Sequence, residues 1–220
     1  MKLIKKIWRF FWKIIFWLVI ISLIPVIAYR WIPVPVTPLM LIRCAEQVKS
    51  GGHLTLKKEW TPISRISKNL QHAVIVSEDQ NFLKHNGFDF DAIEKAVKYN
   101  ENHERKRGAS TISQQTAKNV FLWPGRSWPR KGLEAYFTFL IEICWSKERI
   151  LEVYLNVIET GNGIYGAEAA SQLYFSKSVE ELTKAESALI AASLPNPRKY
   201  SVSNPGPYMR SRAAWIAGHI

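Results

Sequence analysis

The apolar positions of the chain divide it into two parts near residue 30. From Ile14 to Tyr29 no residue is charged. A helix that spans a membrane needs about 20 residues. Extending the apolar run back to Ile7 supplies that length, because the long side chains of Arg9 and Lys13 can reach the lipid head groups. The first part of the chain is therefore predicted to be one transmembrane helix.

A cleaved signal peptide is the alternative for this segment. Such a peptide ends in a small-x-small cleavage site, whereas here the apolar run is followed by the proline-rich stretch 33–38. An uncleaved anchor is therefore favoured. Since basic residues stay on the cytoplasmic side, the N-terminus is expected in the cytoplasm and everything from about Trp31 onward outside the inner face.

From residue 61 onward the apolar positions follow a helical period. Ile63, Ile66 and Leu70 recur at three- and four-residue steps, and Thr61 followed by Pro62 is a typical helix start. Further helices are predicted over 90–100, 110–120 (with Ser110 as cap), 129–144, 147–158 (with Ser146 as cap) and 183–195. The pattern predicts a mainly α domain.

The stretch between the anchor and this domain is less regular. Leu54 and Leu56 alternate with polar residues, which would allow a short β-hairpin. We therefore expect three parts: a basic tail and anchor over 1–32, a juxtamembrane linker over 33–60, and a catalytic domain over 61–220.

Charge and cysteine content change this picture little. The formal net charge is +12, and the first 30 residues carry six basic residues and no acidic ones. Half of the basic excess thus belongs to the tail, and no nucleic-acid-binding motif accompanies it, so a nucleic-acid partner is not expected. Cys44 and Cys144 are too few for a disulfide framework, and neither receives a role.

Residues 78–89 carry the first candidate chemistry. The segment reads Glu-Asp-Gln-Asn-Phe-Leu-Lys-His-Asn-Gly-Phe-Asp, a mixture that a helix interior rarely contains. It follows an apolar helical run, so Glu78 and Asp79 should lie where a packed helix opens into a polar loop. That is a suitable place for a general base. A solvated acidic helix end is the simpler alternative.

Two further segments offer polar groups suited to a phosphorylated sugar. In 108–119, four-residue spacing places Gln114 and Lys118 on one helix face and Gln115 and Asn119 on a neighbouring one. These faces could bind sugar hydroxyls and a phosphate, or could be ordinary exposed surface. Segment 126–134 carries three cations followed by a carboxylate, which suggests an anion site, or a solvated basic loop.

A fourth segment, 147–156, is predicted to be mainly structural. Ile150, Leu151, Tyr154 and Leu155 form one apolar stripe on a helix. Glu152 is expected to face solvent or to pair with neighbouring cations.

Taken together and in this order, these segments resemble the peptidoglycan glycosyltransferases of family 51. The first motif of that family, Glu-Asp-x-x-Phe-x-x-His-x-Gly-x-Asp, is matched at every fixed place. The second, Gly-Gly-Ser-Thr-Ile-[Ser/Thr]-Gln-Gln-x-x-Lys-Asn, is matched except that Ala109 replaces the second glycine. The third, Arg-Lys-x-x-Glu, falls on 130–134, and a fifth around 194–200 also fits. Five ordered motifs over about residues 60–215 are far more specific than one pattern match.

The resemblance implies a lysozyme-like helical fold and a transfer reaction. A growing glycan on a polyprenyl pyrophosphate would be the donor and lipid II the acceptor. Glu78 would take the proton from the acceptor GlcNAc 4-hydroxyl, which attacks MurNAc C1 with inversion, and Glu134 would be a second essential carboxylate. The other residues implied to bind substrate are Asp79, Phe82, His85, Ser110, Thr111, Gln114, Gln115, Lys118, Asn119, Arg126, Arg130 and Lys131.

The resemblance also implies a cofactor, a location and partners. A divalent metal, Mg²⁺ or Mn²⁺, would bind at Glu134 beside the pyrophosphate. The protein would lie in the bacterial inner membrane as a single-pass protein with an extracytoplasmic catalytic domain, and cell-wall synthases or division proteins would be possible partners. A lysozyme-like glycan-cleaving enzyme and a non-catalytic membrane-anchored scaffold remain as alternatives.

Overall fold

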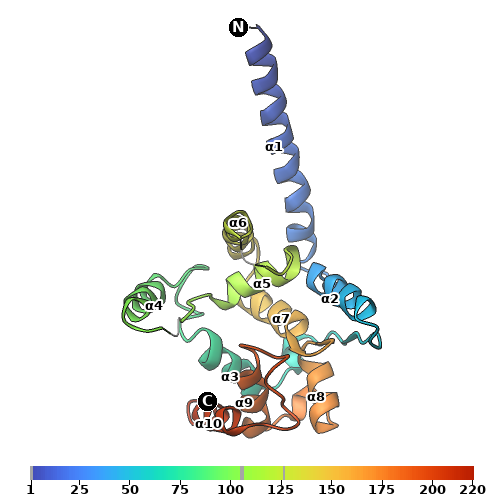
Figure 1. The fold of residues 1–220 in the computed structure, drawn as a ribbon, viewed down its shortest axis with the longest axis vertical. Coiled ribbons are helices and arrows are strands. Elements are labelled where there is room, and N and C mark those ends of the chain that lie inside the picture. Colours follow the sequence, from blue (N-terminus) through green and yellow to red (C-terminus); the bar gives the residue numbers. More distant parts are fainter. Residues whose placement is uncertain (1, 105–106, 126) are drawn as a thin grey trace. The chain divides into compact units, whose positions relative to one another are not determined.

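The computed structural model describes residues 2–104, 107–125 and 127–220, and Figure 1 shows their helices and strands in chain order. Its contacts divide the chain into two compact units, Met1–Pro33 and Val34–Ile220. Each unit has its own internal packing, so each is described by itself.

The first unit is essentially one helix, α1 (Lys2–Ala28). Its segment Lys5–Ala28 is long and apolar enough to cross a membrane, by length and composition. Trp8, Trp12 and Trp17 project from it with more than half of their surface exposed. A helix that exposes so much apolar surface is typical of one that lies in lipid. The helix expected from the sequence is therefore present.

The second unit is mainly helical. Its α-helices are α2 (Pro38–Lys49), α3 (Lys68–Glu78), α4 (Phe90–Asn102), α5 (Ile112–Phe121), α6 (Trp128–Cys144), α7 (Lys147–Val157), α8 (Ala167–Phe175), α9 (Lys184–Ser193) and α10 (Pro207–Ala217). Two 3₁₀ turns, η1 (Ile63–Arg65) and η2 (Val179–Glu181), and three short strands, β1 (Lys57–Lys58), β2 (Glu159–Gly161) and β3 (Ile164–Tyr165), complete the described elements.

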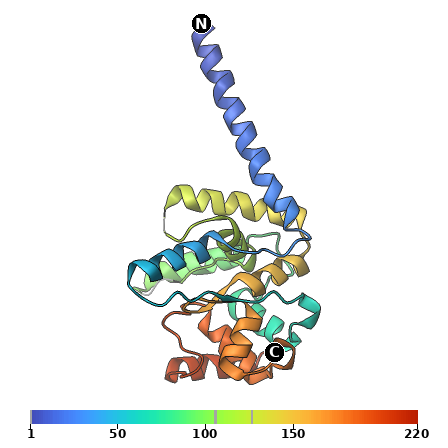
Figure 2. The ribbon, with the colours of Figure 1, turned by 90° about the vertical axis from the view of Figure 1, so that its right-hand side faces the viewer.

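Helix α7 lies in the core of this unit. Ile150, Val153 and Tyr154 have no exposed surface, and Leu155 has almost none. α7 packs against α5, which in turn packs against α6 and lies beside α2, as Figure 2 shows. On the other side of the unit, α9 packs between α3 and α10. The apolar stripe predicted for 147–156 is thus the centre of the fold.

The three strands form a small sheet in the order β1-β3-β2. β1 pairs with β3 in parallel, with Lys57 opposite Ile164, and β2 pairs with β3 in antiparallel fashion. The hairpin suggested around Leu54 and Leu56 is therefore wrong. Residues 38–49 form a helix instead, and β1 finds its partner more than 100 positions away, which local alternation cannot reveal.

Two helix starts also differ from the expectation. Residues 63–65 form a 3₁₀ turn and α3 begins only at Lys68, so Thr61 and Pro62 precede a turn and not the helix itself. The N-cap of α5 is Thr111 rather than Ser110, because the Thr111 hydroxyl accepts a hydrogen bond from the Gln114 backbone N–H. Ser146, by contrast, caps α7 as predicted.

Candidate active site

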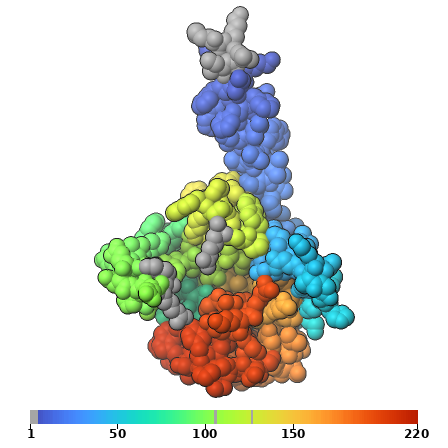
Figure 3. Space-filling model, in the orientation of Figure 1, coloured from blue at the N-terminus to red at the C-terminus, as the bar shows by residue number. Residues whose placement is uncertain are grey.

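A cavity of about 530 Å³ joins residues from motifs that are far apart in the sequence. Glu78 at the end of α3 and Glu134 on α6 both line it, although they are 56 positions apart. In Figure 3 the surface is hollowed between the green and yellow-green segments and the red C-terminal part. The sequence-predicted residues in its wall are Glu78, Ser110, Gln115, Lys118, Asn119, Arg130, Lys131 and Glu134.

Glu78 is partly buried, and hydrogen bonds hold both of its carboxylate oxygens. Gln115 Nε2 donates to Oε2 at 3.0 Å, and the Ser77 hydroxyl donates to Oε1 at 3.3 Å. Burial raises the pKa of Glu78 above its ordinary value; the two hydrogen bonds and the charges of Arg212 and Lys118 oppose that rise. A carboxylate whose pKa is moved toward neutrality is a stronger base while it stays ionised near neutral pH.

Cations gather around the second carboxylate. Arg130 Nη1 donates to Glu134 Oε2 at 2.8 Å, and Lys131 Nζ contacts Glu134 Oε1. Both Arg130 and Glu134 are buried. Burial is the main cause that lowers the pKa of Lys118; the charge of Glu134 raises it, and those of Arg130 and Lys131 lower it further. One carboxylate among three cations leaves this part of the cavity electropositive, as an anion site requires.

Two polar groups at this cationic cluster have no hydrogen-bond partner in the described part of the chain. The side-chain nitrogen Nδ2 of Asn119 and Nε of Arg130 are buried and have no hydrogen-bond partner among the described residues. Buried donors of this kind are costly unless a ligand or water completes them. Arg126, which the sequence places in the same site, lies outside the residues that the structure describes.

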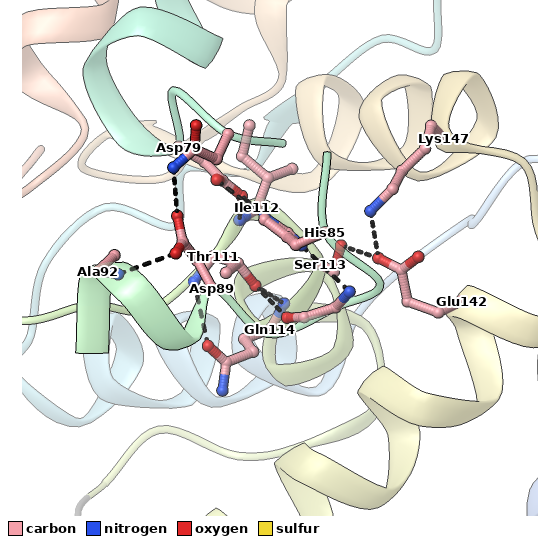
Figure 4. Close-up of polar contacts among 12 residues, drawn as sticks. Asp79, His85, Asp89, Ala92, Thr111, Ile112, Ser113, Gln114, Glu142 and Lys147 are labelled. Atoms are coloured by element: carbon pink, nitrogen blue, oxygen red, sulfur yellow. Dashed lines mark hydrogen bonds and ion pairs between the residues drawn. The ribbon is translucent and has the colours of Figure 1, made fainter. Parts of the chain in front are cut away.

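The first-motif loop owes its shape to a network that Figure 4 shows. Asp79 accepts the Ile112 backbone N–H at 2.9 Å and a hydrogen bond from His85 Nε2 at 3.0 Å. The Gly87 N–H donates to His85 Nδ1 at 3.1 Å, so Nδ1 is unprotonated and the Nε2 proton points to Asp79. Gly87 has a φ of +90° and packs so closely on α6 that a Cβ would lie 2.9 Å from Thr138 Cγ2. This explains why the loop has glycine there.

Thr111 joins this loop to α5. Its hydroxyl donates to the Gly87 carbonyl at 2.6 Å and accepts the Gln114 N–H at 3.2 Å. The Gln114 side chain accepts the Thr111 N–H in return, which completes a capping box. The network therefore fixes the position of α5, and with it the position of Gln115 and Lys118.

These contacts show where five residues lie that the sequence assigns to substrate binding. Phe82 is fully buried, and Gln114 is used in the capping box; neither lines the cavity, and His85 does not line it either. Asp79 and Thr111 are buried and engaged with the protein's own groups. We therefore assign Phe82, His85 and Gln114 to the support of the site, whereas Asp79 and Thr111 support the loop and also line a neighbouring cavity that includes Glu78.

Replacing Thr111 by valine is expected to destabilise the protein by about 2–3 kcal/mol, because it removes a helix cap and leaves the Gly87 carbonyl without its buried partner. Thr183→Val is the matched control. Thr183 also forms a capping box, with Glu186, but it is exposed. Thr183→Val should lower the free energy of unfolding by about 1 kcal/mol. Thermal unfolding in detergent measures both; equal losses would contradict the tertiary role of Thr111.

A second cavity, of about 360 Å³, meets the first at Glu78. Its wall includes Lys95 on α4 and Arg212 and Trp215 on α10. Arg212 donates to the Ser77 carbonyl at 3.2 Å and lies over the Trp215 ring at 4.6 Å. The sequence motifs did not reveal Arg212 and Trp215 because α10 contains none of them, and Lys95 lies between the first two motifs. The Arg-x-x-Trp spacing on one helix face was the available signal.

Arg43 and Glu159 also line the first cavity without having been predicted. Arg43 comes from α2, in the segment expected to be a linker, and its Nε lies 3.7 Å from Glu159 Oε2. Burial raises the pKa of Glu159, against the charge of Arg43. Residues of the presumed linker thus belong to the cavity wall.

The fit of a metal ion follows from the carboxylates present. Within 2–104, 107–125 and 127–220, no three His, Cys, Asp or Glu side chains gather as a metal-binding group. Mg²⁺ is usually held by one or two carboxylates together with waters and substrate phosphates. Glu134 therefore fits an ion that is shared with a phosphate, and does not fit one held by protein groups alone.

A partly buried base candidate beside an electropositive cluster, on a mainly α domain, fits an enzyme that transfers a group from a phosphorylated donor. Comparison with known proteins specifies the family. The family model described as Transglycosylase matches residues 46–220. The chain belongs to this transglycosylase family, whose domain is lysozyme-like, and the helical architecture agrees with that fold.

Several curated relatives carry the name biosynthetic peptidoglycan transglycosylase. The relative from Bdellovibrio bacteriovorus is 56% identical over 195 residues, covering 89% of this chain and 78% of its own. The relative from Bacteroides thetaiotaomicron is 54% identical, covering 97% and 86%. That from Caulobacter vibrioides is 55% identical, covering 88% and 82%. The resemblance found in the motifs is thereby confirmed over nearly the whole chain.

Proposed function

We propose that this protein polymerises the glycan strands of peptidoglycan. It transfers the growing, lipid-pyrophosphate-linked glycan onto the GlcNAc 4-hydroxyl of lipid II, inverts the configuration at MurNAc C1 and releases polyprenyl pyrophosphate. One observation carries the proposal: a single cavity holds the base candidate Glu78 together with a cationic cluster around Glu134. Family membership and the names of the relatives support it.

In the proposed reaction Glu78 is the general base. Its ionised carboxylate accepts the proton of the acceptor hydroxyl while the oxygen attacks the donor carbon. Glu78 lies at the junction of the two cavities, so it can reach a donor in the first and an acceptor in the second. This placement suits a single displacement, in which both substrates must be bound on either side of the base.

The leaving group explains the cations. Inverting glycosidases pair their base with a carboxylic acid that protonates a poor leaving group. A pyrophosphate leaves as an anion, so positive charge fixed in place can replace that acid. We assign this task to Lys118, Arg130 and Lys131, with Glu134 orienting the last two through its ion pairs. Ser110, Gln115 and Asn119 complete the polar wall.

A divalent ion, Mg²⁺ or Mn²⁺, remains part of the proposal. Glu134 would hold it together with the pyrophosphate oxygens. The ion would neutralise charge that develops on the leaving group.

The cationic cluster also weighs against the two alternatives. A glycan-cleaving enzyme has no pyrophosphate to neutralise, whereas Lys118, Arg130 and Lys131 gather beside the base. A scaffold has no use for a partly buried, desolvated carboxylate with a raised pKa, because an unneeded charge in such a place costs free energy. Neither alternative is favoured.

The location of the reaction follows from α1. This helix suits a membrane anchor, and the relatives come from bacteria. We propose a single pass through the inner membrane, with the basic N-terminus in the cytoplasm and the catalytic unit outside, where lipid-linked substrates are within reach. Cell-wall synthases or division proteins are proposed partners, and co-purification of the tagged full chain would test them.

The direct test uses detergent-solubilised full-length protein, labelled lipid II and Mg²⁺ or Mn²⁺. A ladder of glycan that lysozyme digests is the expected product. Release of soluble fragments from purified cell wall, without any polymer from lipid II, would favour the glycan-cleaving alternative. Folded protein that does neither would favour a scaffold.

A further inference from the structure

Tyr154 is a buried titratable group that the proposed mechanism does not use. It belongs to the apolar stripe of α7 and has no exposed surface. A phenol hydroxyl in such a place normally needs a partner. Its partner is Gln115, whose Oε1 accepts the Tyr154 hydroxyl at 3.2 Å. Gln115 Nε2 donates in turn to Glu78 Oε2 at 3.0 Å.

We infer that Tyr154 is a positioning residue: it holds the Gln115 amide in the one orientation that presents N–H, and not C=O, to the Glu78 carboxylate. This inference rests on the proposed role of Glu78 as the base. Tyr154 does not line the cavity, and the sequence pattern assigns it to the core, so the inference adds a core residue to those that support the base.

The two ends of the Gln115 side-chain amide differ, because its NH2 group donates hydrogen bonds and its oxygen accepts them. The Gln115 side chain can rotate by half a turn at little cost in shape, and the turn would bring its oxygen against the Glu78 carboxylate. Tyr154 opposes this turn, because the rotated amide would offer NH2 in place of the oxygen and the hydroxyl proton would lose its acceptor. Burial and the nearby charges of Glu78 and Asp79 raise the pKa of Tyr154 well above its ordinary value, so the phenol keeps its proton and remains a donor.

The other groups that face Glu78 cannot replace this contact. Ser77 precedes it on α3, Arg212 approaches from α10 and Lys118 from α5. Arg212 and Lys118 act on Glu78 through their charges, and neither depends on Tyr154. Among the causes that oppose the burial of Glu78, the hydrogen bond from Gln115 is the largest. Loss of the correct amide orientation should therefore raise the pKa of Glu78 further.

Tyr154→Phe tests the inference, because it removes only the hydroxyl. We expect kcat for lipid II polymerisation to fall about tenfold while KM stays within about twofold, since the base and not the binding is impaired. The sign of the pH effect follows from the raised pKa. The base is lost as the pH falls through that pKa, so the acid limb of the pH profile should move to higher pH in the variant.

The matched control is Tyr165→Phe. Tyr165 is equally buried, but its hydroxyl has no hydrogen-bond partner among the described residues. Its kinetics should stay within about twofold of wild type. Gln115→Leu supplies the second variant: it should move the acid limb in the same direction. Because Tyr154 acts through Gln115, the double variant Gln115→Leu/Tyr154→Phe should be no slower than Gln115→Leu alone.

A measurement without turnover separates this inference from the proposed function. The pKa of Glu78 can be followed by NMR of protein with ¹³C-labelled glutamate carboxylates, with Glu78→Gln used to assign the signal. We expect a higher value in Tyr154→Phe and an unchanged one in Tyr165→Phe. Wild-type protein that makes no glycan would overturn the proposed function alone. An unchanged Glu78 pKa in both Tyr154→Phe and Gln115→Leu, or additive losses in the double variant, would overturn the role of Tyr154.

Discussion

Glu78→Gln is expected to reduce polymerisation of lipid II by about 1,000-fold or more, because positioned general bases contribute about 10²–10⁴-fold. The amide has the shape of the carboxylate and cannot accept the proton of the attacking hydroxyl. Since burial raises the pKa of Glu78, the charge is a cost to the folded state, and its removal should leave the unfolding temperature equal or higher. Glycan formed from labelled lipid II and thermal unfolding measure the two effects.

Glu94→Gln is the matched control, because Glu94 lies on the exposed face of α4 in an ion pair with Lys98. It should keep wild-type activity, since such exposed pairs contribute little. If Glu78→Gln polymerised lipid II at the wild-type rate, Glu78 would not be the general base. Glu134 would then be the leading candidate for the base. Loss of activity together with loss of folded protein would contradict the prediction that the charge is unneeded for the fold.

Lys118→Ala is expected to lower kcat/KM for the lipid-linked donor by about 10–100-fold. A hydrogen bond to a charged group is worth about 1.5–3 kcal/mol, which corresponds to that range. Lys118 is partly buried in the cavity wall, and the lower dielectric there strengthens a charge-assisted contact. Kinetics at varied lipid II concentration give the number. Arg126→Ala should act in the same direction, on the basis of the sequence motif.

Lys98→Ala serves as the control for a change of net charge, because Lys98 is largely exposed on α4 and lines neither cavity. It should leave kcat/KM unchanged. If Lys118→Ala and Arg126→Ala both behaved like Lys98→Ala, the pyrophosphate would have to bind elsewhere, and the cluster around Glu134 would be a structural ion-pair network. An effect on KM alone would place Lys118 in ground-state binding and not in the stabilisation of the leaving group.

Local sequence signals were sufficient for most helices of the catalytic unit. Capping residues and apolar periodicity act over a few residues, so the Ser146 cap and the stripe of α7 could be recognised without a structure. The pairing of β1 with β3 could not, because the two strands are far apart in the chain and only two residues long. The contribution of α2 to the cavity could not be recognised either, because it depends on the packing of α2 against α5.

The roles of the motif residues depended even more on the tertiary structure. The order of the motifs identified the family, but residue type did not separate the groups that line the cavity from those that hold them. Asp79 and His85 have the chemistry of catalytic residues and are used to fix a loop. Tyr154 has the position of a core residue and reaches the base through Gln115.

By itself the sequence determined the class of the protein: an apolar N-terminal helix, a mainly α domain and five ordered motifs of a peptidoglycan glycosyltransferase. These features depend on residue identity and short-range spacing, which a sequence contains directly. The tertiary structure decided that Glu78 and Glu134 share one cavity, that a second cavity meets the first at Glu78, and that Gln115 is held between Tyr154 and the base. Such relations depend on how helices pack, and hydrophobic packing joins residues without regard to their distance in the chain.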